Sequence, residues 1–234
     1  MVRLGRGGER AAKPGQLVAT DAELRIDEGP RYVSRGGLKL EAALDELGMD
    51  VTGRSCLDVG ASTGGFTDCL LQRGAARVLS LDVGRGQLDW SLRNDPRVVV
   101  LEGVNARHLE PGGVPFAADL AVLDVSFISL GKVLGPVAGC LAPDGELVAM
   151  VKPQFELGPG RVGKGGVVRS LEDRREAVAG VTSAAAGAGL ELHGVAPAGV
   201  PGPKGNQEVF VHLRRAGDGI AGSDAAAMIA EAVR

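Results

Sequence analysis

Six polar residues stand at or beside the ends of apolar, β-prone runs, where a parallel sheet would gather them. Asp124 follows the run 120–123, and Lys152 follows the run 147–151. A charge at the end of a buried strand is costly unless it is paired or in contact with water. We therefore expect neighbouring strand ends to pair these two side chains, in a plain salt bridge or around a Lys that orients or activates a nucleophile. The others are Asp58, Asp82, Asn105 and Glu208.

A glycine-rich turn follows the first strand and reads Asp58-Val59-Gly60-Ala61-Ser62-Thr63-Gly64-Gly65-Phe66-Thr67. In doubly wound α/β folds, a nucleotide-like ligand meets the sheet at such a strand–helix junction. Glycine lets the backbone approach the ligand closely, and the helix N-terminus offers free N–H groups. Asp82 ends the next strand, where an acid can accept both hydroxyls of a ribose. Since the turn is not a clean G-x-G-x-x-G, a dinucleotide site and a tight turn without ligand also stay open.

Strands alternate with helices along most of the chain, which is typical of a mostly parallel sheet covered on both faces. Seven strands are expected, and the last pair forms a hairpin-like return that makes the last strand antiparallel. This number favours the methyltransferase variant of the doubly wound sheet, a Rossmann-like seven-stranded α/β fold. The expected strands are 55–59, 77–81, 98–101, 119–124, 146–151, 191–197 and 208–213, and the expected helices are 37–47, 65–72, 86–92, 130–140 and 171–188.

Three regions are expected along the chain. Residues 1–30 form a short N-terminal arm, β-like around 22–26, and Gly29-Pro30 marks its boundary. Residues 31–216 form the main domain, and residues 217–234 form a tail whose helix starts at Ser223 as N-cap. The glycine-rich segment 158–168 carries Arg161 and Lys164 and predicts a mobile loop beside the site.

The composition is that of a soluble globular protein, with 234 residues, 44% hydrophobic and 24% charged. The chain contains no uncharged apolar run of about 20 residues and no apolar signal core, so we expect a cytoplasmic protein without a membrane partner. Cys56, Cys69 and Cys140 lack metal-ligand spacing and are expected to be buried free thiols, and the three His residues are scattered. No metal site is predicted.

Six blocks of the sequence resemble one family. They include YVSRGGLKL at 32–40, DVGRGQL at 82–88, LDVSFISL at 123–130 and VKPQFE at 151–156, together with the turn 58–67 and the segment 202–208. The resemblance is to the haemolysin-A-type (TlyA-like) methyltransferases, within the FtsJ-like S-adenosylmethionine (SAM)-dependent RNA ribose methyltransferases. It extends over about residues 11–214 and implies SAM as cofactor, S-adenosylhomocysteine as product and a methyltransferase domain at 31–216.

The resemblance implies a catalytic tetrad that largely coincides with the polar residues at strand ends. Lys152 would act on the attacked hydroxyl, and Asp124 and Glu208 would hold the Lys residues. The tetrad consists of Lys39, Asp124, Lys152 and Glu208. The implied cofactor site has the turn 60–66 around the methionine moiety, Asp82 at the ribose, and Asn105 and Ala106 near the adenine, with Asp58, Thr67, Val83 and Asp124 beside them.

The substrate is expected to contact Ser34, Arg35 and two aromatic rings. Phe127 and Phe155 flank the two strands that carry Asp124 and Lys152, and the chain has only seven aromatic residues. The two rings could form a stacking wall for a flat substrate, or they could pack beneath the loops.

Two departures from the family shape the expected function. The family normally begins with an RNA-binding domain, of which we expect residues 1–30 to form only a segment like its last strands. Residues 1–40 carry 8 basic and 5 acidic residues, but the remainder carries 18 and 24, whereas RNA binders usually show a basic excess. We therefore expect a small aromatic substrate, such as an indole-type natural-product intermediate. The alternatives are a ribosomal RNA 2′-O-methyltransferase and a SAM-binding or pore-forming accessory protein.

Overall fold

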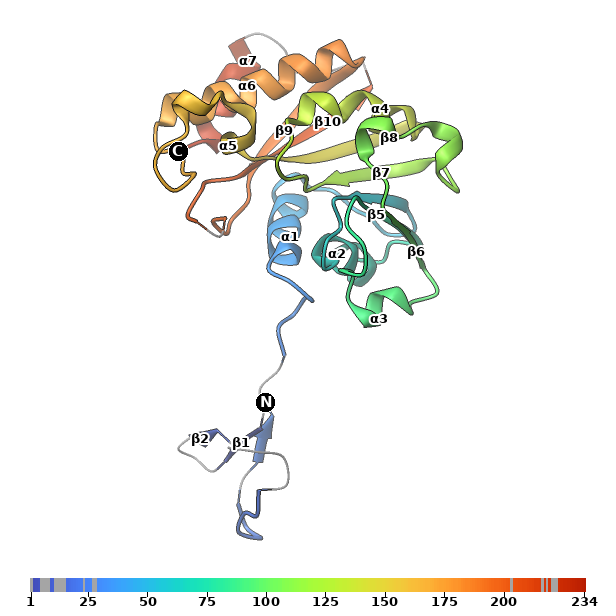
Figure 1. Cartoon of the computed structure of the whole chain (residues 1–234), viewed down its shortest axis with the longest axis vertical. Coiled ribbons are helices and arrows are strands. Elements are labelled where there is room, and N and C mark those ends of the chain that lie inside the picture. Colours follow the sequence, from blue (N-terminus) through green and yellow to red (C-terminus); the bar gives the residue numbers. More distant parts are fainter. Residues whose placement is uncertain are drawn as a thin grey trace. The chain divides into compact units, whose positions relative to one another are not determined.

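The computed structural model describes residues 2–4, 9–10, 16–22, 24–26, 29–202, 204–215, 217, 219 and 223–234. The chain forms two compact units, Met1–Arg31 and Tyr32–Arg234. In the first unit, β1 (Val2–Leu4) pairs antiparallel with β2 (Glu9–Arg10) and with β3 (Leu24–Ile26), as Figure 1 shows.

A seven-stranded sheet organises the second unit. Its order is β6-β5-β4-β7-β8-β10-β9; the first five strands are parallel, and β10 runs antiparallel to both β8 and β9. The expected seven-stranded, Rossmann-like fold with an antiparallel last strand is therefore confirmed. The strands are β4 (Ser55–Val59), β5 (Arg77–Asp82), β6 (Val98–Glu102), β7 (Ala118–Leu123), β8 (Leu141–Val151), β9 (Leu190–Pro197) and β10 (Val209–Arg215).

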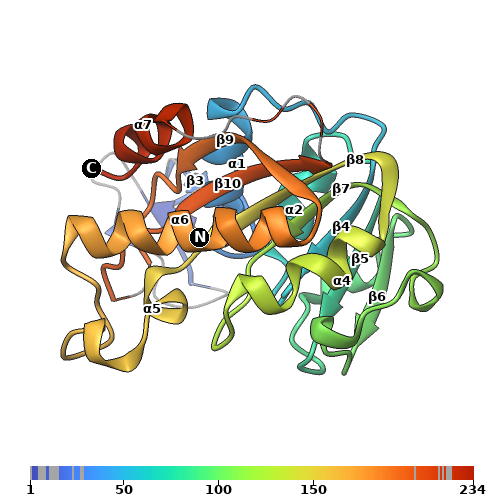
Figure 2. The same ribbon diagram turned by 90° about the horizontal axis from the view of Figure 1, so that it is seen from above.

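Helices cover both faces of this sheet (Figure 2). On one face lie α1 (Gly36–Glu46) and α2 (Gly65–Gln72), and on the other lie α4 (Leu134–Gly139) and α6 (Leu171–Gly187). The shorter elements are α3 (Trp90–Arg93), α5 (Pro153–Glu156), α7 (Ser223–Ala232), η1 (Ala106–His108), η2 (Pro111–Gly113), η3 (Leu130–Lys132) and η4 (Pro159–Arg161).

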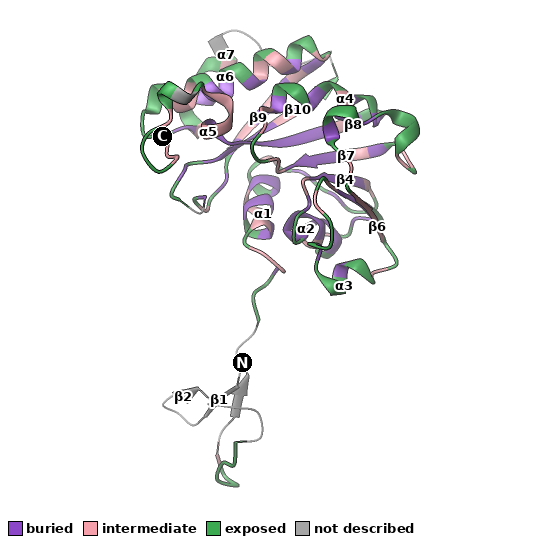
Figure 3. Ribbon diagram, in the orientation of Figure 1, coloured by how far each residue is buried: buried purple, intermediate pink, exposed green. Residues whose placement is uncertain are grey.

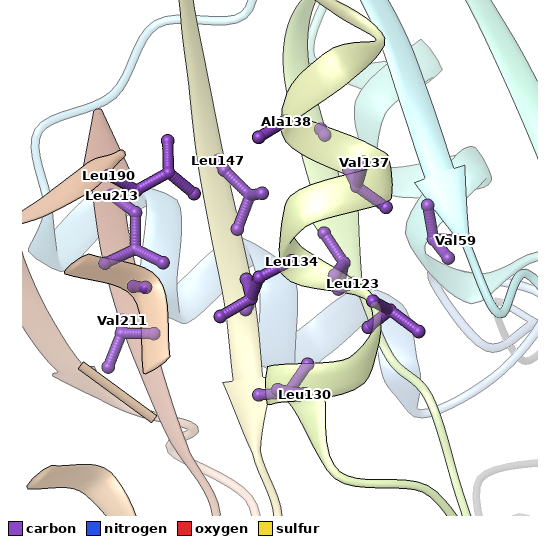
Figure 4. Close-up of a cluster of buried hydrophobic side chains, with 14 of the residues drawn as sticks. Val59, Leu123, Leu130, Leu134, Val137, Ala138, Leu147, Leu190, Val211 and Leu213 are labelled. Carbon is purple, nitrogen blue, oxygen red and sulfur yellow. The ribbon is translucent and has the colours of Figure 1, made fainter. Parts of the chain in front are cut away.

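Two apolar cores lie on the two sides of the sheet, because successive side chains of a strand point to opposite faces. In β8, Leu147 and Ala149 pack with α4 and α6, whereas Val148 and Met150 pack with α1 and α2. Figure 4 draws part of the first cluster, and Figure 3 shows that the central strands are mostly buried. Burial on both faces explains why these strands are continuous apolar runs in the sequence.

Two expected helices differ from the structure. Most of the segment 86–92 is not helical, because Gly86 takes a left-handed φ of +69° and the Asp89 carboxylate accepts a hydrogen bond from the Ser91 N–H, which starts α3 only at Trp90. The segment 130–140 divides into η3 and α4. Pro136 lacks the N–H that a continuous helix would donate to the Lys132 carbonyl.

The segment 158–168 is tied to its surroundings at both ends. The buried Asn206 accepts a hydrogen bond from the Val168 N–H (3.0 Å) and donates one to the Gly166 carbonyl (2.7 Å). Arg161 forms ion pairs with Asp173 and Glu176 on α6. The mobility of this segment stays a prediction.

Other expectations concern the cysteines, the tail and the membrane. Cys56, Cys69 and Cys140 are buried free thiols, as predicted. The tail contains α7, but the side chain of Ser223, its expected N-cap, lies outside the described residues. Among the described helices, none combines the length and the apolar character needed to cross a bilayer. The described residues also include no cluster of three or more His, Cys, Asp or Glu suited to a metal ion.

We predict that Phe210→Ala strongly destabilises the second unit. Phe210 is fully buried and its ring lies 5.8 Å from the ring of Phe66, centroid to centroid, so its removal leaves a cavity between β10 and α2. The free energy of unfolding should fall by about 3–5 kcal/mol in urea titrations followed by circular dichroism. Val99→Ala on the exposed edge strand is the control and should change it by less than about 0.5 kcal/mol. A loss of similar size in both variants would contradict this account of the core.

Candidate active site

Three cavities open along the carboxyl edge of the sheet, and Asp124, just past β7, lines all of them. Cavity A has a volume of about 350 Å³ and lies at the ends of β4, β5 and β7. Cavity B, of about 230 Å³, lies between the glycine-rich turn and the segment 34–36. Cavity C, of about 500 Å³, lies beyond β7 and β8. The carboxyl edge of a doubly wound sheet is where ligands bind in this class of fold.

Two ion pairs stand at the inner wall of cavity C. Lys39 of α1 pairs with Glu208, which directly precedes β10, and their side chains are only 9% and 2% exposed. Lys152 follows β8 and pairs with Asp124, as expected for neighbouring strand ends. Because a buried charge without a partner is strongly unfavourable, each member of these pairs requires the other.

A hydroxyl also contacts Lys152. Its Nζ donates a hydrogen bond to the Ser126 Oγ over 2.9 Å. Ser126 lies in the loop after β7 and lines both cavity A and cavity C. The amine that faces cavity C is therefore held by two oxygen atoms from one loop.

Two aromatic rings face each other at the mouth of cavity C. The ring centroids of Phe127 and Phe155 are 5.1 Å apart, and the planes are tilted by 48°. Phe127 is 91% exposed and has a φ of +63°, a left-handed conformation that costs about 1 kcal/mol or more for a residue with a side chain. This exposure excludes the alternative that both rings pack beneath loops.

Asp82 stands at the end of β5 in cavity A. Its Oδ1 accepts a hydrogen bond from the Gly84 N–H (2.7 Å), and its Oδ2 accepts one from the Ser62 N–H (2.8 Å). These two bonds fix the carboxylate and leave lone pairs on both oxygens. Val83, Asn105 and Ala106 also line this cavity.

Asp58 stands at the end of β4 and lines cavity B. Its Oδ2 accepts hydrogen bonds from the Thr67 N–H (2.9 Å) and the Thr67 hydroxyl (2.7 Å). Within the described part of the chain, its Oδ1 is buried and has no partner. Burial, and to a smaller extent the nearby Asp124 and Asp82, raise the pKa of Asp58 to about 7. Thr67 is fully buried, so it acts on cavity B only through Asp58.

The backbone around cavity B is closely packed. Gly60 has a φ of +86°, and a Cβ there would lie 2.5 Å from the Asp124 carbonyl oxygen. A Cβ on Gly65 would lie 2.2 Å from the Ser34 Oγ. Ser34 and Arg35, expected at the substrate, line cavity B and not cavity C.

Several residues of cavity C were not singled out from the sequence: Ser126, Gln154, Lys204 and Asn206. Ser126 and Gln154 lie inside the blocks 123–130 and 151–156, which was the only available signal, because a neutral side chain after a strand carries no charge to be explained. The Gln154 Oε1 is buried and has no partner among the described residues.

The comparisons with known proteins identify the family. A family model described as FtsJ-like methyltransferase matches residues 32–215. The chain belongs to this family. It is 50% identical over 209 residues to the 16S/23S rRNA (cytidine-2′-O)-methyltransferase TlyA of Mycobacterium tuberculosis, which is 88% of this chain and 78% of TlyA. This FtsJ-like protein of the TlyA and haemolysin A type is therefore a SAM-dependent methyltransferase.

Two further comparisons agree. A 23S rRNA (cytidine-2′-O)-methyltransferase TlyA of Campylobacter jejuni is 33% identical over 85% of this chain and 77% of that protein. A solved structure from Streptococcus thermophilus has a TM-score of 0.82 and 40% identity over 99% of this chain and 85% of that chain.

These relatives overturn the expectation of a small aromatic substrate from natural-product biosynthesis, and they favour the ribosomal RNA alternative. The expectation relied on the acidic charge of the chain past residue 40. Such a sum does not show where the charges lie, and binding depends on the local field. Cavity C is lined by Lys204 in addition to Lys39 and Lys152, which are paired with Glu208 and Asp124. The alternative of a non-enzymatic accessory protein is also wrong, because the family is enzymatic.

We predict that Asp58→Asn changes how stability depends on pH. The pKa of Asp58 is about 7 in the folded protein against an ordinary value of 3.8. Between these values the folded protein binds more protons than the unfolded chain. The free energy of unfolding therefore falls as pH rises, by up to about 1.4 kcal/mol per pH unit from this group, and levels off above the pKa of the folded state. The free energy of unfolding of Asp58→Asn, measured in urea, should therefore rise relative to that of wild type as pH increases from 5 to 8.

Asp89→Asn is the matched control. Hydrogen bonds from Ser91 lower the pKa of Asp89, so this carboxylate is ionised in both states across that range. An Asp58→Asn difference that is equal at pH 5 and pH 8 would show that Asp58 is ionised in the folded protein.

Proposed function

We propose that this protein transfers a methyl group from SAM to the 2′-hydroxyl of a cytidine in ribosomal RNA. The observation that carries this proposal is the presence of two Lys–carboxylate pairs in cavity C, Lys39–Glu208 and Lys152–Asp124. Asp124 also lines the other two cavities. The names of the relatives, one of them 50% identical, support ribosomal RNA as the substrate.

The cofactor fits cavities A and B. Asp82, with a lone pair free on each oxygen, would accept the ribose hydroxyls, and Val83, Asn105 and Ala106 would surround the adenine. The unpartnered Oδ1 of Asp58 would face the ammonium of the methionine moiety in cavity B. When bound, SAM supplies an electrophilic methyl group and departs as the neutral thioether. The residues of the turn that would contact SAM are Gly60, Ala61, Ser62, Thr63, Gly64, Gly65 and Phe66.

Lys152 would act as the base that accepts the proton of the attacked hydroxyl. In its amine form, Nζ accepts the proton that the 2′-hydroxyl releases as its oxygen bonds to the methyl carbon, and Asp124 stabilises the ammonium that forms. Lys39, neutralised by Glu208, lies in the same cavity and would hold the ribose and its phosphate in place.

The mouth of cavity C suits a nucleobase turned out of its stack. Sequence-specific RNA enzymes commonly bind unstacked bases on aromatic side chains and read their polar edges. Phe127 and Phe155 would stack on the base. The unpartnered Gln154 Oε1 would accept a hydrogen bond from its amino group, which satisfies a buried acceptor.

The remaining assignments follow from this function. We place the methyltransferase domain at 31–216, between an N-terminal arm at 1–30 and a tail at 217–234. A ribosomal substrate implies a cytoplasmic location.

We predict that the wild type labels ribosomal RNA and that Lys152→Ala does so poorly. Ribosomal subunits from a strain lacking this methylation should gain label from methyl-labelled SAM, recovered as 2′-O-methylcytidine after nuclease digestion and mass spectrometry. Loss of the proton acceptor should lower kcat by about 10²- to 10⁴-fold, with the Kd for SAM changed less than about threefold. Lys132→Ala, on the exposed part of η3, should retain activity.

Two outcomes would count against this function. If neither the small-subunit nor the large-subunit RNA gains label, although the protein is folded and binds SAM, ribosomal RNA is excluded as the substrate. Full turnover by Lys152→Ala would exclude Lys152 as the proton acceptor.

We predict the opposite division of effects for Asp82→Ala. Because Asp82 would bind the ribose, its loss should weaken SAM binding by about tenfold or more, measured by calorimetry, while kcat at saturating SAM falls much less. Asp144→Ala, an exposed carboxylate on β8, is the control and should leave the Kd unchanged. Unchanged SAM affinity in Asp82→Ala would refute the placement of the ribose.

A further inference from the structure

The Ser126 hydroxyl is held where it can direct the Lys152 amine. The loop that carries it leaves β7 at Asp124 and is fastened again a few residues later, where Glu156 accepts hydrogen bonds from the Ser129 hydroxyl (2.6 Å) and the Leu130 N–H (2.9 Å). Ser126 lies between these two fixed points, so its position is set by the same loop that supplies Asp124.

The Lys152 amine nitrogen is tetrahedral, so partners that hold its N–H groups restrict the direction of its lone pair. Nζ donates a hydrogen bond to the Ser126 Oγ and forms an ion pair with Asp124, whose Oδ1 accepts no hydrogen bond from the described residues. In the amine form, Ser126 therefore holds one N–H, the charge of Asp124 attracts the other, and the lone pair takes the remaining tetrahedral position. With Asp124 alone, the amine would rotate about its contact and the lone pair would point in many directions.

We infer that Ser126 is a positioning residue, which acts through Lys152 by aiming its lone pair at the attacked hydroxyl. The inference rests on the proposed function for the identity of that hydroxyl. Ser126 requires no proton of its own in this role: the proton passes from the 2′-hydroxyl to Nζ, and Ser126 accepts a hydrogen bond before and after the transfer.

Thr and Val at position 126 form a matched pair of variants, because their side chains have nearly the same shape and only Thr keeps the hydroxyl. Ser126→Val should lower kcat by about 10- to 100-fold, the size expected for a hydrogen bond to a charged group. Ser126→Thr should stay within about threefold of wild type. The Kd for SAM should be unchanged in both. Equal kcat in the Thr and Val variants, or a weaker Kd that accounts for the loss, would overturn the inference.

A double-mutant cycle separates action through Lys152 from an independent role. On the Lys152→Ala background, Ser126→Val should cause no further loss of kcat, since no lone pair is left to aim. If Ser126→Val instead lowers kcat by the same factor with and without Lys152, Ser126 acts directly on the substrate or the cofactor.

A measurement without RNA tests the contact itself. In a ¹H–¹⁵N spectrum of Lys side chains, the Lys152 signal, assigned by its absence in Lys152→Ala, should persist in Ser126→Thr and shift or broaden in Ser126→Val. An unchanged signal in Ser126→Val would overturn the inference. Failure of wild type to label ribosomal RNA would refute the proposed function but leave this spectroscopic result valid.

Discussion

The two buried Lys residues at the carboxyl end of the sheet are tolerated because each is paired with a carboxylate. Lys39, Lys152 and Glu208 are nearly inaccessible, and removal of any partner would leave an uncompensated buried charge. The pairs join α1 to the start of β10 and the end of β7 to the end of β8, so they depend on the strand order that brings these termini together. The glycine-rich turn joins the same system, because Gly60 approaches the Asp124 backbone more closely than any other residue type would allow.

Much of this arrangement could be predicted from the sequence, for a physical reason. Apolar runs that end in a charged residue require a sheet edge where the charge is satisfied. Asp58, Asp82, Asp124 and Lys152 therefore predicted the strands and the edge of the sheet at which the cavities lie. The helix 86–92 was wrong because an apolar period does not show that Gly86 and Asp89 delay the helix. Ser126 and Gln154 were missed because neither is charged, and their place in cavity C depends on the loop after β7 and on the short α5.

The substrate could not be derived in the same way. Whether an RNA is bound depends on where Lys and Arg side chains gather, and composition gives only their sum. Phe127 was more informative. Its ring is 91% exposed to water and its backbone is left-handed, and both features are unfavourable for an aromatic residue. Together with Phe155, it provides a surface for any flat group, so the choice of a nucleotide rests on the relatives and not on these rings.

The unpartnered oxygen of Asp58 has a consequence for how the enzyme takes up its methyl donor. With a pKa of about 7, this carboxyl is roughly half protonated at neutral pH before the cofactor enters. A positively charged amino group placed against it favours the ionised form, so occupancy of cavity B and release of a proton are thermodynamically linked. With the cofactor placed as proposed, its binding would therefore release a proton from Asp58.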